Sequence, residues 1–240
     1  MRIKICGLMN AEDCRVINRC RPDYAGFVFA DTRHRISDET AAELRENLDA
    51  GIPAVGVFVD DEPAHIASLI AAGTIQIVQL HGHEDAAYIA RLRELIMETV
   101  QDRRWRTGTT ETGTVPIIRA FRLPAEAFSE TLAGLEDRID CLLLDTAVKG
   151  VPGGSGKRFD LSLVPAKITK PWFLAGGLTP DNIAQVLEEL RTVVRAKGGQ
   201  MPFAVDVSSG VESERMGGHK DDARTERFCE KVRTLEMSGA

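Results

Sequence analysis

The stretch IQIVQLHGHEDAAYIARLREL, residues 75–95, holds one complete repeating unit of the fold. Its first part, IQIVQL (75–80), is rich in β-branched and other apolar residues, which is typical of a buried strand. After the short turn HGH (81–83), the segment EDAAYIARLREL (84–95) spaces its apolar residues as an amphipathic helix does. A buried strand followed directly by a helix is the building unit of a parallel sheet.

The same unit recurs on both sides of this stretch. Helical spacing returns in 37–48, 62–73 and 179–190, and the last of these offers Thr179 as N-cap and Pro180 at the first helical position. Seven further strands are predicted: RIKIC (2–6), YAGFVF (24–29), AVGVFV (54–59), VPIIRAF (115–121), IDCLLLD (139–145), PWFLAG (171–176) and FAVDV (203–207).

Eight strands alternating with helices in 240 residues predict an α/β fold, a single (β/α)8 TIM barrel over residues 1–240. The alternative is a doubly wound open sheet, which normally carries a glycine-rich dinucleotide turn after its first strand. Here that turn reads CGLMN and contains no GxGxxG. Two polar stretches, near 101–115 and 195–200, interrupt the repeat and are predicted to be solvated loops at the opposite end of the barrel from the active site.

The composition excludes several classes of partner. The net charge is −6 with Lys and Arg scattered along the chain, so we expect neither a nucleic-acid partner nor an anionic membrane surface. No apolar run approaches the roughly 20 residues that span a bilayer. The five cysteines are odd in number and form no CxxC pair, which favours a reducing, cytoplasmic location.

The carboxyl ends of the predicted strands carry the chemistry. In a barrel these ends form the active face, which selects Cys6, His81 and Asp145 at the ends of strands one, four and six. Since side chains alternate along a strand, Lys4 is expected inside the barrel one layer below Cys6. Asp206 has the matching position on strand eight, which neighbours strand one in a closed barrel. We therefore expect a Lys4–Asp206 ion pair, because a buried lysine needs a partner.

Two small-residue turns predict a phosphate site. Barrels that bind phosphorylated metabolites often hold the phosphate with the loops after strands seven and eight. In this chain those loops contain Gly176 and Gly177, and then Ser208, Ser209 and Gly210.

A third glycine-rich segment follows strand six. It reads GGSGKR (153–158) and does not satisfy the P-loop pattern. It is interpreted as a mobile loop that folds over a ligand, with a plain surface loop as the alternative, and its small residues are Gly153, Gly154, Ser155 and Gly156.

The histidines of HGH (81–83) have no accompanying cluster of ligand residues, so no metal is expected. His81 is predicted to contact substrate, with a structural role as the alternative.

In order along the chain, a set of short motifs resembles the phosphoribosylanthranilate isomerase family of tryptophan biosynthesis. The motifs cover essentially the whole chain, and together they are far more specific than any one of them: KICGL (4–8), GFVF (26–29), VGVFV (55–59), VQLHG (78–82), LLLDT with GGSGKRFD (142–160), LAGGLTPDN (174–182) and DVSSGVES (206–213).

The resemblance implies an Amadori rearrangement of a phosphorylated substrate without metal or organic cofactor. It implies that Cys6 is the general base and Asp145 the general acid. The family uses an arginine after strand two for the anthranilate carboxylate, and we favour Arg33 over Arg35 for that role. Asp206 is also placed among the substrate-binding residues. The chain departs from the family pattern at Met9 and Leu161.

Three alternatives remain in view. A ribulose-phosphate epimerase needs strand-end metal ligands that the sequence lacks. A dual-substrate isomerase usually pairs aspartates at strands one and six, and Cys6 argues against that. A non-catalytic phosphometabolite binder needs neither Cys6 nor Asp145. The sequence leaves monomer and homodimer equally open.

Overall fold

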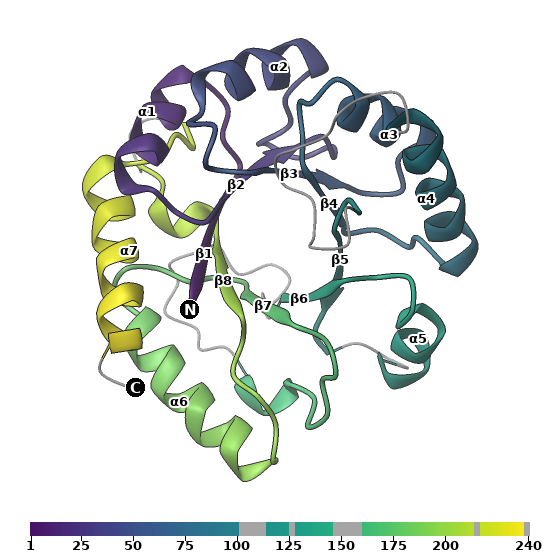
Figure 1. The fold of residues 1–240 in the computed structure, drawn as a ribbon. Helices are drawn as coiled ribbons and strands as arrows, with labels where there is room; N and C mark the ends of the chain where they lie inside the picture. The colour runs from purple at the N-terminus through teal and green to yellow at the C-terminus, as the bar shows by residue number, and fades with distance from the viewer. Residues whose placement is uncertain (101–113, 125–127, 146–159, 214–216, 238–240) are drawn as a thin grey trace.

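A closed parallel barrel forms the centre of the molecule (Figure 1). The computed structural model describes residues 1–100, 114–124, 128–145, 160–213 and 217–237. The eight strands pair in chain order, and the last strand pairs with the first, which confirms the (β/α)8 prediction. The strands are β1 (Arg2–Cys6), β2 (Tyr24–Val28), β3 (Ala54–Phe58), β4 (Ile77–Leu80), β5 (Ile117–Arg122), β6 (Cys141–Asp145), β7 (Trp172–Ala175) and β8 (Ala204–Val207).

An outer ring of helices covers the barrel (Figure 1). In the described part of the chain, the connection from β6 to β7 contains the 3-10 helix η1 (Leu161–Leu163), whereas every other connection carries an α-helix. A second 3-10 helix, η2 (Ser209–Val211), follows β8. The α-helices are α1 (Ala11–Cys20), α2 (Asp38–Asn47), α3 (Pro63–Ala71), α4 (Ala86–Val100), α5 (Phe128–Leu135), α6 (Ile183–Ala196) and α7 (Asp222–Met237).

Local sequence explains where several helices begin. The Asn10 side chain accepts a hydrogen bond from the Asp13 N–H at the start of α1, and a serine N-cap does the same for α2. At α6 the prediction was three residues early. The Thr179 hydroxyl accepts from two following N–H groups, but it closes a turn that leads into the helix at Ile183.

The helix α6 also ends later than predicted, because it runs through Ala196. The polar connection expected at 195–200 therefore starts at Lys197. Of the other polar stretch, 101–115, only residues 114 and 115 lie within the described residues, and Val115 is buried.

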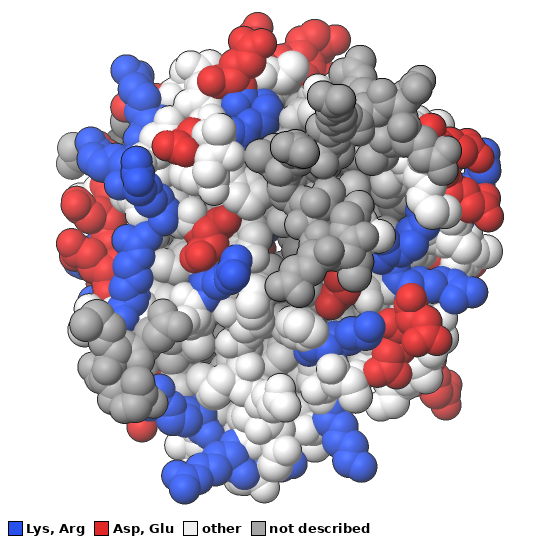
Figure 2. Space-filling view, in the orientation of Figure 1, with Lys and Arg blue, Asp and Glu red and all other residues white. Residues whose placement is uncertain are grey.

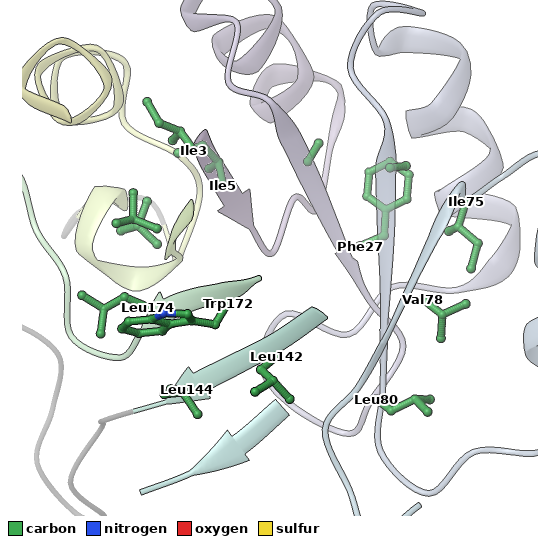
Figure 3. Close-up of a cluster of buried hydrophobic side chains, with 14 of the residues drawn as sticks. Ile3, Ile5, Phe27, Ile75, Val78, Leu80, Leu142, Leu144, Trp172 and Leu174 are labelled. Atoms are coloured by element: carbon green, nitrogen blue, oxygen red, sulfur yellow. The ribbon is translucent and has the colours of Figure 1, made fainter. Parts of the chain in front are cut away.

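Alternation along the strands divides the core into two parts. Outward-facing strand residues pack between the barrel and the helices, as Figure 3 shows for Ile3, Phe27, Leu142 and Trp172. Inward-facing residues fill the barrel itself. They form a lower cluster that includes Ile118 and a small cluster above it of Cys6, Val28 and Val57. The inner core therefore stops just below the carboxyl ends of the strands, where the polar residues of the site begin.

The surface carries charges of both signs. Figure 2 shows acidic and basic side chains interspersed around the face it presents. No helix within the described ranges is long and apolar enough to cross a membrane.

Candidate active site

A cavity of about 340 Å³ opens at the carboxyl end of the barrel. Each of the eight strands supplies at least one residue to its wall, so the site is a product of barrel closure. The strand residues in the lining are Cys6, Val28, Val57, Gln79, Arg122, Leu143, Asp145, Ala175, Asp206 and Val207. The loops add, among others, His34, His81, Gly176, Gly177, Ser208, Ser209 and Gly210.

The floor of the cavity is a buried ion pair. Lys4 and Asp206 are direct partners in the β1–β8 register, and the Lys4 Nζ lies 2.9 Å from the Asp206 Oδ2. Lys4 has no exposed surface, while Asp206 is 9% exposed. The predicted pair is therefore present in the structure. It leaves the buried Asp206 Oδ1 without a hydrogen-bond partner among the described residues.

Cys6 lies above this pair, and a glycine makes room for it. Gly26 is the register partner of Cys6 on β2. A Cβ atom added to Gly26 would lie 2.6 Å from the Cys6 Sγ, well inside van der Waals contact. The absence of a side chain at this strand position is what allows the thiol to point into the cavity.

Burial and charge act in opposite directions on Cys6. Burial raises the pKa of the thiol, and the Lys4 ammonium lowers it only in part, so the net pKa stays above its ordinary value. For Lys4, burial is the largest influence and lowers the pKa, but the charges and hydrogen bonds of Asp206 and Cys6 together outweigh it, and the net pKa is raised. Lys4 is thus held in the charged form next to the sulfur.

A short polar chain leads from β4 to the end of β6. The Gln79 Nε2 lies 3.3 Å from the His81 Nδ1. The His81 Nε2 lies 3.7 Å from the Asp145 Oδ2. Both the Gln79 Oε1 and the His81 Nε2 are buried without a hydrogen-bond partner in the described part of the chain. Together with the Asp206 Oδ1, they are three buried polar atoms, on residues that line the cavity, without partners among the described residues.

The loops after β7 and β8 approach each other closely. Gly176 and Gly177 both have positive φ, at 98° and 53°. A Cβ at Gly210 would lie 1.8 Å from the Leu178 carbonyl oxygen, so only glycine fits there. Among the described residues, no group accepts a hydrogen bond from the backbone N–H of Gly176, Gly177, Ser209 or Gly210. Clustered free N–H groups of this kind suit an anion.

Glu212 ties three separate segments together at the rim. Its carboxylate accepts from the His34 Nε2 at 2.7 Å, the Arg33 guanidinium at 2.5 Å and the Lys220 Nζ at 3.0 Å. Burial raises the pKa of Glu212, but the hydrogen bond from His34 and the charge of Lys220 outweigh it, and the pKa falls to about 2. These three contacts fix the His34 ring in the cavity wall. The ring packs closely on Gly7, because a Cβ added to Gly7 would lie 3.1 Å from it.

The two arginines proposed for carboxylate binding do not line the cavity. The charge of Arg33 is engaged by Glu212, and Arg35 is exposed outside the wall. The residue between them, His34, faces the cavity instead. In the short loop after β2 the sequence offers no periodicity to decide which of three successive side chains points inward. Glu212, 178 residues away from His34 in the chain, holds both Arg33 and His34, and of these two only His34 lines the cavity.

Sequence reasoning missed Arg122 and Glu212, and it placed Gln79 at the end of strand four without giving it a role. Alternation from His81 would have assigned Gln79 to the cavity wall, because residues two apart on a strand share a face. His83 is exposed and pairs with Asp60, away from the cavity. The described residues contain no group of three His, Cys, Asp or Glu that could hold a metal ion. The glycine-rich segment with Gly153, Gly154, Ser155 and Gly156 lies outside the described residues.

Comparison with known proteins gives a consistent result. Residues 3–231 match the sequence model of the N-(5'-phosphoribosyl)anthranilate (PRA) isomerase family. The N-(5'-phosphoribosyl)anthranilate isomerase of Endomicrobium trichonymphae is 40% identical over 212 residues, 88% of this chain and 90% of that protein. That of Lachnoclostridium phytofermentans is 36% identical over 240 residues, 95% of each chain.

Solved structures show the same likeness. The phosphoribosylanthranilate isomerase of Thermotoga maritima superimposes with a TM-score of 0.73 at 34% identity, covering 98% of this chain and 100% of the other. A second structure of such an isomerase contains reduced 1-(o-carboxyphenylamino)-1-deoxyribulose 5-phosphate. It superimposes with a TM-score of 0.69 at 31% identity, and also covers 98% and 100% of the two chains.

Proposed function

Because the chain belongs to the N-(5'-phosphoribosyl)anthranilate isomerase family and is an isomerase of tryptophan biosynthesis, we propose that Cys6 is its general base and Asp145 its general acid. The reaction is an Amadori rearrangement to 1-(2-carboxyphenylamino)-1-deoxyribulose 5-phosphate. One observation carries the assignment: Cys6 on β1 and Asp145 on β6 line the same cavity.

The two groups divide the chemistry between them. Asp145 gives its proton to the furanose ring oxygen, the bond from that oxygen to C1 breaks, and the nitrogen lone pair forms an iminium. The Cys6 thiolate then removes the proton from C2, and the electron pair moves to the nitrogen to give an enaminol. A proton shift from the enaminol hydroxyl to C1 yields the ketone. Atoms and electrons balance without an external oxidant or reductant.

The base has to be a thiolate, because the neutral thiol is a poor proton acceptor. Burial opposes this form, and the charge of Lys4 favours it. The rate at which Cys6 removes the C2 proton should accordingly rise with pH, because more of the thiol ionises. Lys4 stabilises the Cys6 thiolate most when it is charged, and the ion pair with Asp206 favours that charged form.

The rest of the cavity fits the remaining parts of this substrate. The free N–H groups of Gly176, Gly177, Ser209 and Gly210 are the proposed phosphate site. Of the described residues in the wall, Arg122 supplies a fixed positive charge for the anthranilate carboxylate in this proposal. The bound phosphorylated analogue in a solved relative supports this class of ligand.

The protein is proposed to work in the cytoplasm. All five cysteines are free thiols in the structure, and Cys6 must stay reduced to act as a base. One solved relative from Thermotoga maritima is described as dimeric. The quaternary state of this chain stays open between monomer and homodimer.

Steady-state kinetics on Cys6→Ser and Asp145→Asn test the assignment. Serine cannot serve as a base near neutrality, and asparagine cannot donate the ring-opening proton. Each change should lower kcat by roughly 10²–10⁴-fold. Turnover is measured by the loss of anthranilate fluorescence. The melting temperature and KM should change little, because both changes are nearly isosteric and the phosphate loops are untouched.

Cys141→Ser is the matched control, since Cys141 lies at the other end of the barrel interior on β6. It should retain kcat. A Cys6→Ser enzyme with near-normal kcat would return Cys6 to the role of a small buried apolar residue.

A further inference from the structure

Gln79 is a buried polar residue for which the mechanism above has no use. It is 2% exposed, inside the barrel near the carboxyl end of β4. Its side-chain amide nitrogen lies 3.3 Å from the His81 Nδ1. In this orientation of the Gln79 amide its nitrogen donates, so the His81 Nδ1 accepts and the ring proton lies on Nε2.

The other side of the His81 ring faces the proposed acid. The Nε2 lies 3.7 Å from the Asp145 Oδ2 and has no hydrogen-bond partner in the described part of the chain. With the proton on Nε2, this N–H lies on the side of the ring nearest Asp145. Among the described residues Gln79 hydrogen-bonds His81 and not Asp145, and its side chain determines which ring nitrogen of His81 carries the hydrogen.

Building on the proposed function, we infer that Gln79 is a positioning residue that keeps His81 neutral, with its Nε2–H toward Asp145. An imidazolium carries a proton on both nitrogens. Its Nδ1–H would meet the amide N–H of Gln79, two donors facing each other in a buried site, which is unfavourable. The contact thus selects against the charged ring as well as against the wrong tautomer.

The groups packed around His81 shift its pKa in both directions, and burial is the largest influence. Burial lowers the pKa of His81, and Asp145 on β6 raises it. Arg122 on β5 and Lys4 on β1 lower it, and Asp206 on β8 raises it. The net pKa is lowered, which agrees with a neutral ring.

Neutrality of His81 matters for the acid. A positive charge within about 4–6 Å favours the ionised form of a carboxyl group. An imidazolium at 3.7 Å would therefore draw the proton away from Asp145, which has to keep it to open the ring. A neutral imidazole can orient the carboxyl or a substrate oxygen without this penalty.

Gln79→Glu is the decisive variant. A carboxylate at this position accepts a hydrogen bond from Nδ1–H and stabilises the imidazolium, by roughly 1–3 pKa units for a close opposite charge. We expect kcat at neutral pH to fall at least about tenfold, with KM changed much less. The alkaline limb of the kcat–pH profile should move to lower pH. Nitrogen-15 NMR of the His81 ring should change from neutral Nε2–H in the wild type to doubly protonated.

Two further variants separate charge from structure. Gln79→Met removes the donor without adding charge, so both the tautomer preference and the bias against the imidazolium should weaken, and the alkaline limb should move in the same direction as in Gln79→Glu but by less. His83→Gln changes an exposed histidine of the same loop and should leave both the profile and the His81 signals unchanged.

An Nδ1–H tautomer in the wild type, or a Gln79→Glu profile that coincides with the wild type, would overturn the inference. Failure of the proposed function is seen separately, as an active Asp145→Asn enzyme, because the NMR readout needs no turnover.

Discussion

Two buried ion pairs lie on opposite sides of the barrel wall, and they are built differently. Lys4–Asp206 lies inside, under Cys6. Arg119–Glu84 lies outside, behind β4 and β5, with 3.2 Å between the Arg119 NH1 and the Glu84 Oε2. Both pairs are almost completely buried. They differ in how fully the remaining polar atoms are satisfied.

Nearly all the polar atoms of the outer pair have hydrogen-bond partners. Arg119 donates to the carbonyl oxygens of Leu80, Gly82 and Ala120. Glu84 accepts from the backbone N–H groups of Asp60 and Gly82. Only the Arg119 Nε lacks a partner among the described residues. This pair fixes the loop after β4, which carries His81, against the neighbouring strand.

The inner pair is less completely satisfied. Asp206 uses one oxygen for Lys4, and its other oxygen is buried without a partner among the described residues. Lys4 shares its charge between Asp206 and the sulfur of Cys6. An unsatisfied buried oxygen costs stability. The difference indicates that the outer pair serves the fold, whereas the inner pair gives up part of its stabilisation to bind and activate.

Asp206→Asn should have the largest effect, because it touches both functions. It leaves a buried ammonium without its counter-ion, which costs on the order of 3–5 kcal/mol. It also favours the neutral form of Lys4, so the thiolate of Cys6 loses support and kcat should fall. Denaturant unfolding and steady-state kinetics measure the two effects. Unchanged stability would show that the inner pair is not coupled to the fold.

Glu84→Gln should cost a similar 3–5 kcal/mol, since it strands the buried Arg119 guanidinium. Here kcat per folded molecule should stay near the wild-type value. The same two measurements apply. A loss of kcat as large as that of Asp206→Asn would remove the distinction between the two pairs.

Glu212 forms a third charged cluster, at the rim of the cavity, in which both carboxylate oxygens have partners. Its pKa is lowered from 4.5 to about 2. The carboxylate therefore stabilises the folded state above pH 4.5, and this stabilisation is lost as pH falls toward 2. A shift of that size is worth on the order of 3 kcal/mol. Glu212→Gln should flatten the stability–pH curve in this window, as measured by urea unfolding at a series of pH values.

Gly26→Ala should have the smallest effect on stability, about 1–3 kcal/mol from overpacking. The added methyl group would push the Cys6 Sγ away from its place above the inner pair, so kcat should fall although no ionisable group changes. Gly134→Ala on α5 is the control, because a Cβ there meets nothing within 4 Å. If Gly26→Ala keeps full kcat, the position of the sulfur is less restricted than the geometry indicates.

Much of this arrangement follows from the sequence because it depends on local periodicity. The strand–helix repeat predicted the barrel, and the two-residue alternation predicted that Lys4 lies under Cys6 opposite Asp206. Barrel closure then requires the carboxyl ends of all strands to share one face. Cys6 and Asp145 meet there although 138 residues separate them.

The loops escaped such reasoning because they have no period. The sequence does not distinguish Arg33, His34 and Arg35. In the folded chain Glu212, from a distant segment, holds both Arg33 and His34, and only His34 of the three lines the cavity. The outer pair likewise joins a loop after β4 to a strand in a way that no spacing indicates.

The sequence by itself determined the order of the strands and the inward set of residues, and both follow from steric rules that act within a few residues of chain. The proposed acid and base were implied by the resemblance to a known family, not by those rules. Only the tertiary structure decided which side chain of the loop after β2 reaches the cavity, which oxygen of Asp206 lacks a partner among the described residues and which nitrogen of His81 faces Gln79. Those outcomes depend on hydrogen bonds between segments that meet only when the barrel closes.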